Sequence, residues 1–155
     1  MIMKEMESQN LNFFNVATDT ELDLSFVNEG IHAGFPSPAP DNVSLSLDLN
    51  RELIRHPAAT FFARVVGDSM RDADVAEGDL LVIDRSLEPH NGNMVVCFID
   101  GEFTLKFIRL DEREKGVIWL VPANPDFPEI KVTPDNNFMV WGVVAYTIKN
   151  RLHKL

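Results

Sequence analysis

The sequence predicts a mainly β protein, a single curled antiparallel domain with a short N-terminal arm. Three observations lead to this fold class. Short apolar runs recur along the chain and are separated by turn residues, among them 9 prolines and 8 glycines. The pair Asp100-Gly101 joins two of these runs, as the turn of a β-hairpin does. About seven short strands with few helices are expected, and this composition favours one curled antiparallel β domain.

Residues 1–33 form the predicted N-terminal arm. They have no clear hydrophobic period, although the alternation in 22–26 favours a short strand. The apolar clusters of the arm, such as the one with Leu11, Phe13 and Phe14, are too small to form a core of their own. We therefore expect the arm to pack on another part of the protein.

The chain is strongly acidic. Its formal net charge is −10, and residues 1–33 hold six acidic residues against a single lysine. A protein that binds duplex DNA directly usually needs a basic face. The charge therefore argues against direct duplex-DNA binding, and it is compatible with a basic protein partner or with ordinary solubility.

A proline-rich link is predicted over residues 34–47. Pro36, Pro38 and Pro40 stand at alternate positions, and each biases the residue before it toward extended backbone. Such a stiff, slim peptide serves either as a spacer or as a place where the chain is cut.

The domain proper is predicted over residues 48–155, and it opens with a short helix. Residues 48–57 fit a helix that Asp48 or Asn50 can cap and that Pro57 stops. The pattern then changes to short runs that are apolar or alternate, which is typical of strands. These predicted strands are Phe61–Val66, Leu80–Ile83, Met94–Ile99, Phe103–Leu110, Val117–Val121 and Phe138–Ile148.

The protein is expected to be soluble and cytoplasmic. Its single cysteine, Cys97, excludes an internal disulfide framework, and its apolar neighbours indicate a small core residue. No apolar run approaches the roughly 18–20 residues that span a bilayer. The first residues also lack the long apolar stretch of a secretory signal. We expect no membrane association.

No metal or cofactor is expected either. The histidines stand outside metal-binding patterns such as His-Glu-x-x-His, and no glycine loop that could cradle a phosphate is present. A Ser-His-Asp triad has no local signature here, although its members need not be close in the chain. The four histidines are His32, His56, His90 and His153.

Ser69 is a candidate nucleophile. It stands in Gly67-Asp68-Ser69-Met70, just after a predicted strand, where a turn can hold its hydroxyl exposed. Serines are common in turns, so this motif indicates little by itself. A serine becomes a nucleophile when a base takes its proton.

Lys106 is the candidate base. Alternation along its strand places Thr104 and Lys106 on one face and Phe103 and Leu105 on the other. A strand lysine is usually a solvated surface residue. At the reference pKa of about 10.4, only about 1 in 2,500 lysines is neutral at pH 7. Burial beside apolar neighbours lowers that pKa, and a lysine with a pKa near 7–8 is well matched to activating a serine such as Ser69.

Three motifs together resemble one family. The stretch Ala33-Gly34-Phe35-Pro36-Ser37-Pro38, the turn Gly67-Asp68-Ser69-Met70 and the pair Leu105-Lys106 are similar, in order and spacing, to the cleavage site, nucleophile and base of the UmuD group of LexA-like self-cleaving proteins. The resemblance covers residues 33–148. It implies a LexA-like serine protease domain at 48–155, with residues 1–33 removed by self-cleavage.

The resemblance also implies the roles of the site residues. Lys106 takes the proton of Ser69, which attacks the Ala33 carbonyl and cuts the Ala33–Gly34 bond. The backbone N–H groups of Asp68 and Ser69 resemble the oxyanion hole. In this family, cleavage belongs to the SOS response to DNA damage and is stimulated by RecA filaments on single-stranded DNA. The shortened protein is a homodimer that joins a UmuC-type polymerase for error-prone translesion synthesis.

Three other classes of protein share some of these features. LexA and phage repressors need a helix-turn-helix domain before the cleavage site, and the acidic residues 1–33 show no such pattern. A signal-peptidase-like enzyme needs a membrane anchor, and no apolar run is long enough. A polymerase-binding subunit that does not cleave itself stays open, although Ser69, Lys106 and Ala33-Gly34 are all present. The arm is longer than in familiar members, so its contacts are the least transferable feature.

Overall fold

The computed structural model describes residues 11–18, 23–26, 33–34 and 45–152, and the chain forms two compact units. The larger unit comprises Met1–Val16 together with His56–Leu155, and the smaller comprises Ala17–Arg55. The sequence predicted an arm over residues 1–33, a link over 34–47 and a domain over 48–155. These boundaries assume a cut after residue 33 and stay a prediction.

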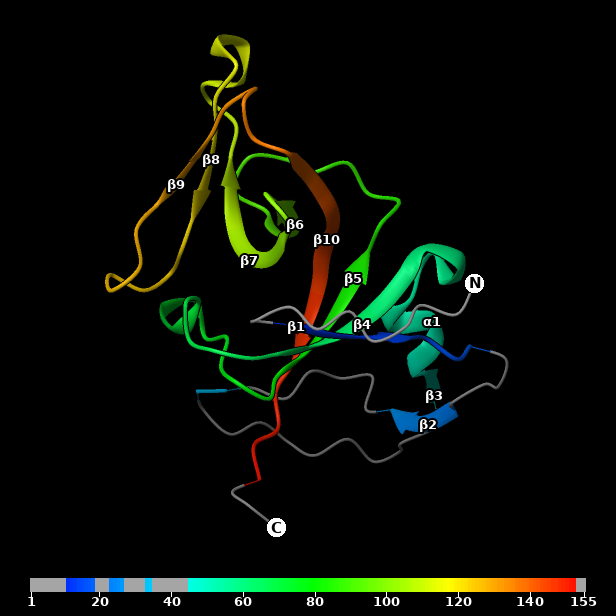
Figure 1. Cartoon of the computed structure of the whole chain (residues 1–155). Coiled ribbons are helices and arrows are strands. Elements are labelled where there is room, and N and C mark those ends of the chain that lie inside the picture. The colour runs from blue at the N-terminus through cyan, green and yellow to red at the C-terminus, as the bar shows by residue number, and fades with distance from the viewer. Residues whose placement is uncertain (1–10, 19–22, 27–32, 35–44, 153–155) are drawn as a thin grey trace. The chain divides into compact units, whose positions relative to one another are not determined.

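An antiparallel sheet of eight strands forms the larger unit. Its strand order is β1-β4-β5-β10-β6-β7-β8-β9, and every neighbouring pair is antiparallel (Figure 1). The mainly β fold class is therefore confirmed. The strands are β1 (Leu11–Asn15), β4 (Thr60–Val65), β5 (Leu80–Asp84), β6 (Met94–Ile99), β7 (Glu102–Arg109), β8 (Ile118–Val121), β9 (Ile130–Val132) and β10 (Phe138–Ile148).

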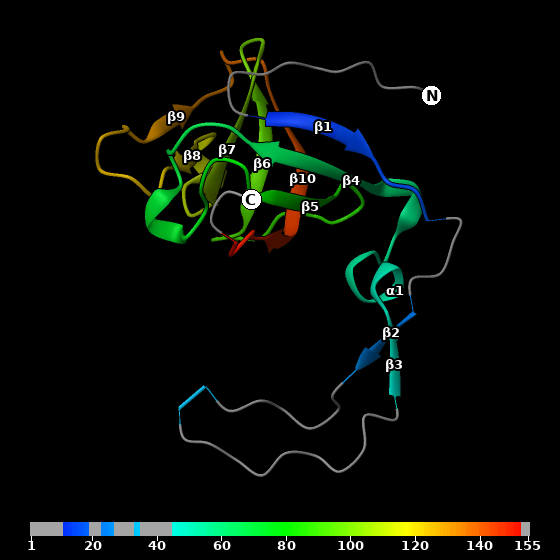
Figure 2. The same cartoon turned by 90° about the horizontal axis from the view of Figure 1, so that it is seen from below.

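The sheet is curled, and it is buried on both faces near its middle. The long strand β10 runs between β5 and β6, and β7 bends strongly along its length (Figures 1 and 2). Two register shifts interrupt the pairing of β10, which is where a strand bends most easily. One buried cluster includes Phe103, Leu105 and Trp141, and a second includes Val95 and Ile108. Successive residues of β7 therefore face two different cores.

Gly142 stands at one of these register shifts and has no room for a side chain. An added Cβ would lie 2.5 Å from Cγ2 of Ile83 on β5 and 3.3 Å from Cγ of Arg85. Ile83 is a buried β-branched residue whose χ1 is restricted, so it cannot turn aside cheaply.

We expect Gly142→Ala to destabilise the fold by about 1–3 kcal/mol because overpacking forces the two strands apart. The melting temperature should fall by about 5 °C, as measured by circular dichroism. Gly34→Ala is the matched control, since a Cβ at Gly34 meets no atom within 4 Å. Equal melting temperatures for the two variants would contradict the clash expected at Gly142.

The hairpin predicted at Asp100-Gly101 is confirmed. Both residues have positive φ, 47° and 93°, and β6 pairs with β7 from Ile99 opposite Glu102 onward. Positive φ at both central residues is the type I′ geometry that joins twisted strands tightly. This turn sets the register that brings Lys106 opposite Val95.

The other predicted strands are also present, with ends shifted by a residue or two. Three further strands were not predicted: β1, β9 and β3 (Leu45–Asp48). Residue Phe14 hid the alternation of β1, because it is apolar yet half exposed. β9 has three residues only. The expectation that the arm packs on another part of the protein is confirmed for β1, which pairs with β4.

The smaller unit holds a two-stranded sheet and a short helix. β2 (Asp23–Phe26) pairs antiparallel with β3, which begins inside the predicted link. Helix α1 (Leu49–Leu53) follows directly, and the Asp48 carboxylate caps it by accepting a hydrogen bond of 3.0 Å from the Asn50 N–H. The prediction of a capped helix that ends before Pro57 is therefore confirmed.

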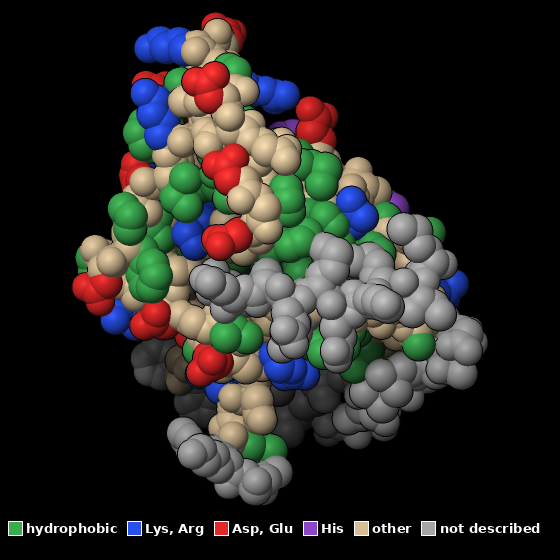
Figure 3. Space-filling model, viewed as in Figure 1, with side chains coloured by type: hydrophobic (Ala, Val, Ile, Leu, Met, Phe, Trp, Pro, Cys, Tyr) green, Lys and Arg blue, Asp and Glu red, His purple; other side chains and the backbone are tan. Residues whose placement is uncertain are grey.

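Charged side chains of both signs share the surface. On the face shown in Figure 3, the described lysines and arginines are interspersed with aspartates and glutamates rather than gathered in one area.

Candidate active site

Ser69 stands in a tight turn that follows β4. Gly67 has φ +88°, a conformation that glycine adopts without strain, and a short 3-10 helix begins at Arg71. The turn reverses the chain and leaves the Ser69 side chain partly exposed, whereas Met70 is buried in the core. The turn that the sequence predicted at Ser69 is therefore present, with the serine side chain partly exposed.

Hydrogen bonds to a neighbouring loop fix the carbonyls of this turn. The carbonyl of Asp68 accepts bonds from the Asn124 side-chain amide, at 2.9 Å, and from the Arg71 N–H, at 3.1 Å. The Ser69 carbonyl accepts a bond of 2.9 Å from the Ala123 N–H. Asn124 is itself buried, so the turn is held from inside the fold and its geometry is set in advance.

Two backbone amides of the same turn have no hydrogen-bond partner in the described part of the chain. Neither the Asp68 N–H nor the Ser69 N–H donates a hydrogen bond to any residue that the structure describes. The carbonyls are thus anchored and the N–H groups remain available. Two neighbouring backbone N–H groups beside a serine hydroxyl are the usual composition of an oxyanion hole.

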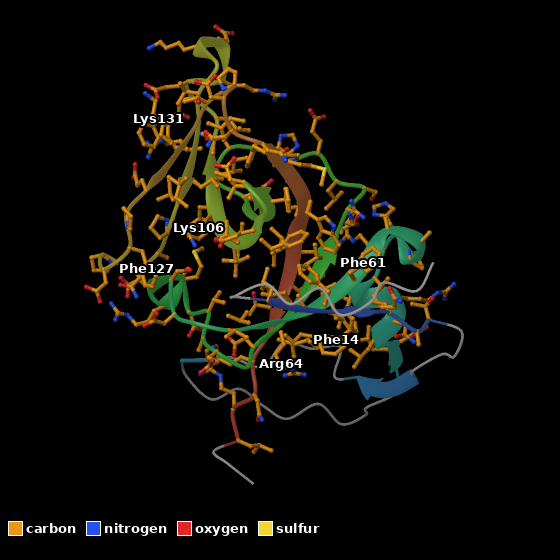
Figure 4. The ribbon with its side chains drawn as sticks, viewed as in Figure 1. Phe14, Phe61, Arg64, Lys106, Phe127 and Lys131 are labelled. Carbon is orange, nitrogen blue, oxygen red and sulfur yellow. The ribbon has the colours of Figure 1, made fainter. Side chains whose placement is uncertain are left out.

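Lys106 lies beside Ser69. It projects from β7 (Figure 4), and its Nζ stands 3.0 Å from Oγ of Ser69, within hydrogen-bond distance. Nζ also donates to Oγ1 of Thr104 at 2.9 Å and to the Leu105 carbonyl at 3.0 Å. Residues 37 positions apart in the chain are brought together in this way.

The lysine is buried without an acidic partner. Its exposed fraction is 5%, and none of the ion pairs among the described residues includes it. On the neighbouring strand it faces Val95, and Thr104 faces Cys97, both fully buried. Burial lowers the pKa of Lys106 from 10.5 to about 8.

Cys97 is a core residue, as predicted. Burial raises the pKa of its thiol to about 12, so the thiol stays neutral while Lys106 titrates. It therefore supplies no negative charge that could hold Lys106 protonated near neutral pH.

Ala33 and Gly34 belong to the smaller unit, in the connection between β2 and β3, and both are exposed. An added Cβ at Gly34 would meet open space, so the folded state itself does not require a glycine at this position. A requirement for small residues would arise when the bond enters a narrow site.

Sequence reasoning gave no role in the site to three residues that shape it. Alternation placed Thr104 on the strand face of Lys106, two residues away, but its contact with Nζ was not predicted. Asn124 and Ala123 could not be found from the sequence, because they are more than 50 positions from Ser69 and stand in no motif. Their role follows only from the way the loop after β8 packs on the turn.

The structure shows two further features of the chain. Among the described residues, no group of three His, Cys, Asp or Glu side chains is placed to hold a metal ion. In the same part of the chain, no helix has the length and apolar character needed to cross a membrane.

Comparison with known proteins identifies the family. Residues 25–145 match the family described as Peptidase S24-like. Protein MucA of Salmonella typhimurium is 43% identical over 126 residues, which are 81% of this chain and 84% of that protein. Protein ImpA of Shigella flexneri is 47% identical over 116 residues, 75% of this chain and 77% of that protein. The LexA repressor of Paracidovorax citrulli is 34% identical over 122 residues, 79% of this chain but 53% of the repressor. The chain therefore belongs to the Peptidase S24-like family of LexA-like self-cleaving proteins, which confirms the resemblance found in its sequence.

Proposed function

We propose that this protein is a UmuD-like serine endopeptidase that cuts its own Ala33–Gly34 bond, with Ser69 as nucleophile and Lys106 as general base. The observation that carries the proposal is the 3.0 Å contact between Nζ of Lys106 and Oγ of Ser69. No acidic side chain that the structure describes pairs with this lysine, and burial lowers its pKa to about 8. A neutral amine at hydrogen-bond distance from a serine hydroxyl is what serine activation requires.

The first step forms an acyl-enzyme. The lone pair of neutral Nζ accepts the Ser69 proton while Oγ forms a bond to the Ala33 carbonyl carbon. The carbonyl oxygen becomes an oxyanion, and the free N–H groups of Asp68 and Ser69 stabilise its charge. The bond from Ala33 to the Gly34 nitrogen then breaks, and the ammonium of Lys106 donates its proton to the leaving amine.

The second step hydrolyses the acyl-enzyme. Lys106, neutral again, accepts a proton from water as the water oxygen attacks the ester between Ala33 and Ser69. The ester breaks, and Ser69 regains its hydroxyl proton from the Lys106 ammonium. The products are residues 1–33 with a new carboxylate and residues 34–155 with a new amine.

The contacts of Nζ support this cycle. When Lys106 is charged, its N–H groups are bound by Ser69, Thr104 and the Leu105 carbonyl. When it is neutral, the Ser69 hydroxyl can donate along the same 3.0 Å line, while Thr104 and Leu105 hold the two remaining hydrogens. The amine is thus oriented toward the serine in both states.

Regulation and partners are proposed from the resemblance. Cleavage is conditional, since a partner that favours docking of the Ala33–Gly34 bond raises the rate by shifting a population. We infer that this partner is the RecA filament on single-stranded DNA. The cut form then acts in the cytoplasm as a homodimeric accessory subunit of a UmuC-type translesion polymerase.

Incubation of the purified full chain at about pH 10 tests the proposal, because Lys106 is then neutral without any partner. We expect slow first-order conversion, at a rate independent of protein concentration if the cut is intramolecular. Mass spectrometry should place the new N-terminus at Gly34. A chain that stays intact, or one cut at another bond, would contradict the mechanism and favour a subunit that does not cleave itself. Adding RecA filaments at neutral pH tests the trigger separately.

A further inference from the structure

Both described strands of the arm pair with strands that follow the proposed cut. β1 pairs along its whole length with β4, from Leu11 opposite Val65 to Asn15 opposite Phe61. β2 pairs with β3 over four residues. The bond between Ala33 and Gly34 lies in the connection between β2 and β3, so cutting it interrupts neither strand pair.

β1 is held by the core as well as by its backbone. Leu11 is fully buried and Phe13 is 7% exposed. The Phe13 ring stands 5.1 Å from the ring of Phe103 and 4.7 Å from that of Trp141, in tilted and edge-on contacts that favour binding. The next residue, Phe14, points to the other face and is 45% exposed (Figure 4).

Without β1, the outer edge of β4 would lack a paired strand. β4 has β5 on its other side, and among the described strands it is β1 that covers its outer edge. Without β1, the unpaired N–H and C=O groups of that edge would be exposed, together with the apolar faces of Phe103 and Trp141. An exposed edge beside apolar side chains is the arrangement by which proteins bind extended peptides.

We propose that the outer edge of β4, with Phe103 and Trp141, is a binding site for an extended peptide with apolar side chains two residues apart. Its first ligand is the arm itself: residues 1–33 stay bound there after cleavage until another segment of this kind displaces them. This inference rests on the proposed self-cleavage at Ala33–Gly34. Cleavage and release of the arm are then two separate steps.

The connection between the arm's two strands strengthens its retention. Only residues 16–22 separate β1 from β2. When one strand leaves, the other keeps the arm close to its site, so rebinding competes well with escape. A competing peptide has to fill the β1 site while it is briefly empty.

The test separates retention of the arm from self-cleavage. A recognition sequence for a site-specific protease is inserted between Pro40 and Asp41 of the full-length Ser69→Ala variant, and the chain is cut there by the added protease. Native mass spectrometry and gel filtration then follow the released N-terminal fragment. We expect it to stay with the body of the protein at micromolar concentration.

A matched pair of neighbouring phenylalanines shows whether the β1 site is responsible. Phe13→Ala should speed loss of the fragment by at least about tenfold, because truncating a buried phenylalanine is costly. Phe14→Ala removes the same side chain from the exposed face and should change the rate by less than about twofold. Labelled peptide 8–18 should displace the fragment, whereas the same peptide with Leu11→Asn and Phe13→Asn should not.

Two results would overturn the inference. One is a fragment that separates from the body as soon as the chain is cut. The other is retention that Phe13→Ala and Phe14→Ala affect equally. Neither depends on Ser69, so an uncut wild-type chain would refute the proposed peptidase activity alone.

Discussion

Self-cleavage should fall by at least about a thousandfold in Lys106→Met and in Ser69→Ala. Ser69→Ala removes the nucleophile, and Lys106→Met removes the base while filling nearly the same volume. A positioned base contributes about 10²–10⁴ in rate, and loss of the nucleophile costs at least as much. The double variant should be no slower than the single ones, because the two groups act as a unit. The rate of appearance of residues 34–155 at fixed pH measures all three.

Lys131→Met is the matched control for the lysine. Lys131 is exposed on β9, and its substitution changes charge and shape in the same way as Lys106→Met (Figure 4). Its cleavage rate should stay within about twofold of wild type. A Lys106→Met variant that still cleaves at a comparable rate would exclude Lys106 as the base, and an inactive Lys131→Met would indicate a general effect of charge.

Much of this site could be predicted from the sequence, because its parts are local. The turn at Ser69 is encoded by Gly67, whose positive φ ends a strand, and the hairpin at Asp100-Gly101 fixes the strand on which Lys106 stands. Alternation then gives the strand face of Lys106. None of these local signals shows that the lysine is buried, since alternation assigns a residue to one face of β7 but does not say whether that face is covered.

Burial of Lys106 depends on the curl of the sheet, which is a property of the whole fold. It arises because Val95 lies opposite Lys106, Cys97 lies opposite the neighbouring Thr104, and the turn with Ser69 closes over the end of the lysine. The anchoring of that turn by Asn124 was equally unpredictable, since a single asparagine in a loop carries no signal. β1 was missed for a different reason: the apolar Phe14 stands at an outward position and masks the period of the strand.

The rate of self-cleavage should follow the titration of Lys106. Its pKa of about 8 means that the neutral base rises from about 1% at pH 6 to about 90% at pH 9. The rate should therefore increase nearly a hundredfold over this interval and then level off. A lysine with its ordinary pKa would instead give a rate that is still rising tenfold per pH unit at pH 9. First-order rates from pH 6 to pH 11, followed by mass spectrometry, distinguish the two profiles.

The same pKa should appear in the stability of the fold, independently of any cleavage. The folded pKa lies below the unfolded value, so the unfolded chain binds more protons between pH 8 and pH 10.5, and stability rises with pH across that window. Below pH 8 the buried lysine lowers the stability of the fold by about 3 kcal/mol, and that cost disappears as the pH approaches 10.5.

In the Ser69→Ala background, Lys106→Met should thus stabilise the fold at pH 7. The gain should be less than about 3 kcal/mol because the Leu105 carbonyl loses its donor. Urea unfolding of the two variants at pH 7 and pH 10.5 measures the difference in stability, which should move by about 3 kcal/mol in favour of the chain with Lys106 at the higher pH. A difference that is the same at both pH values would mean that Lys106 titrates alike in the folded and unfolded chain, and the burial argument for its role as a base would fail.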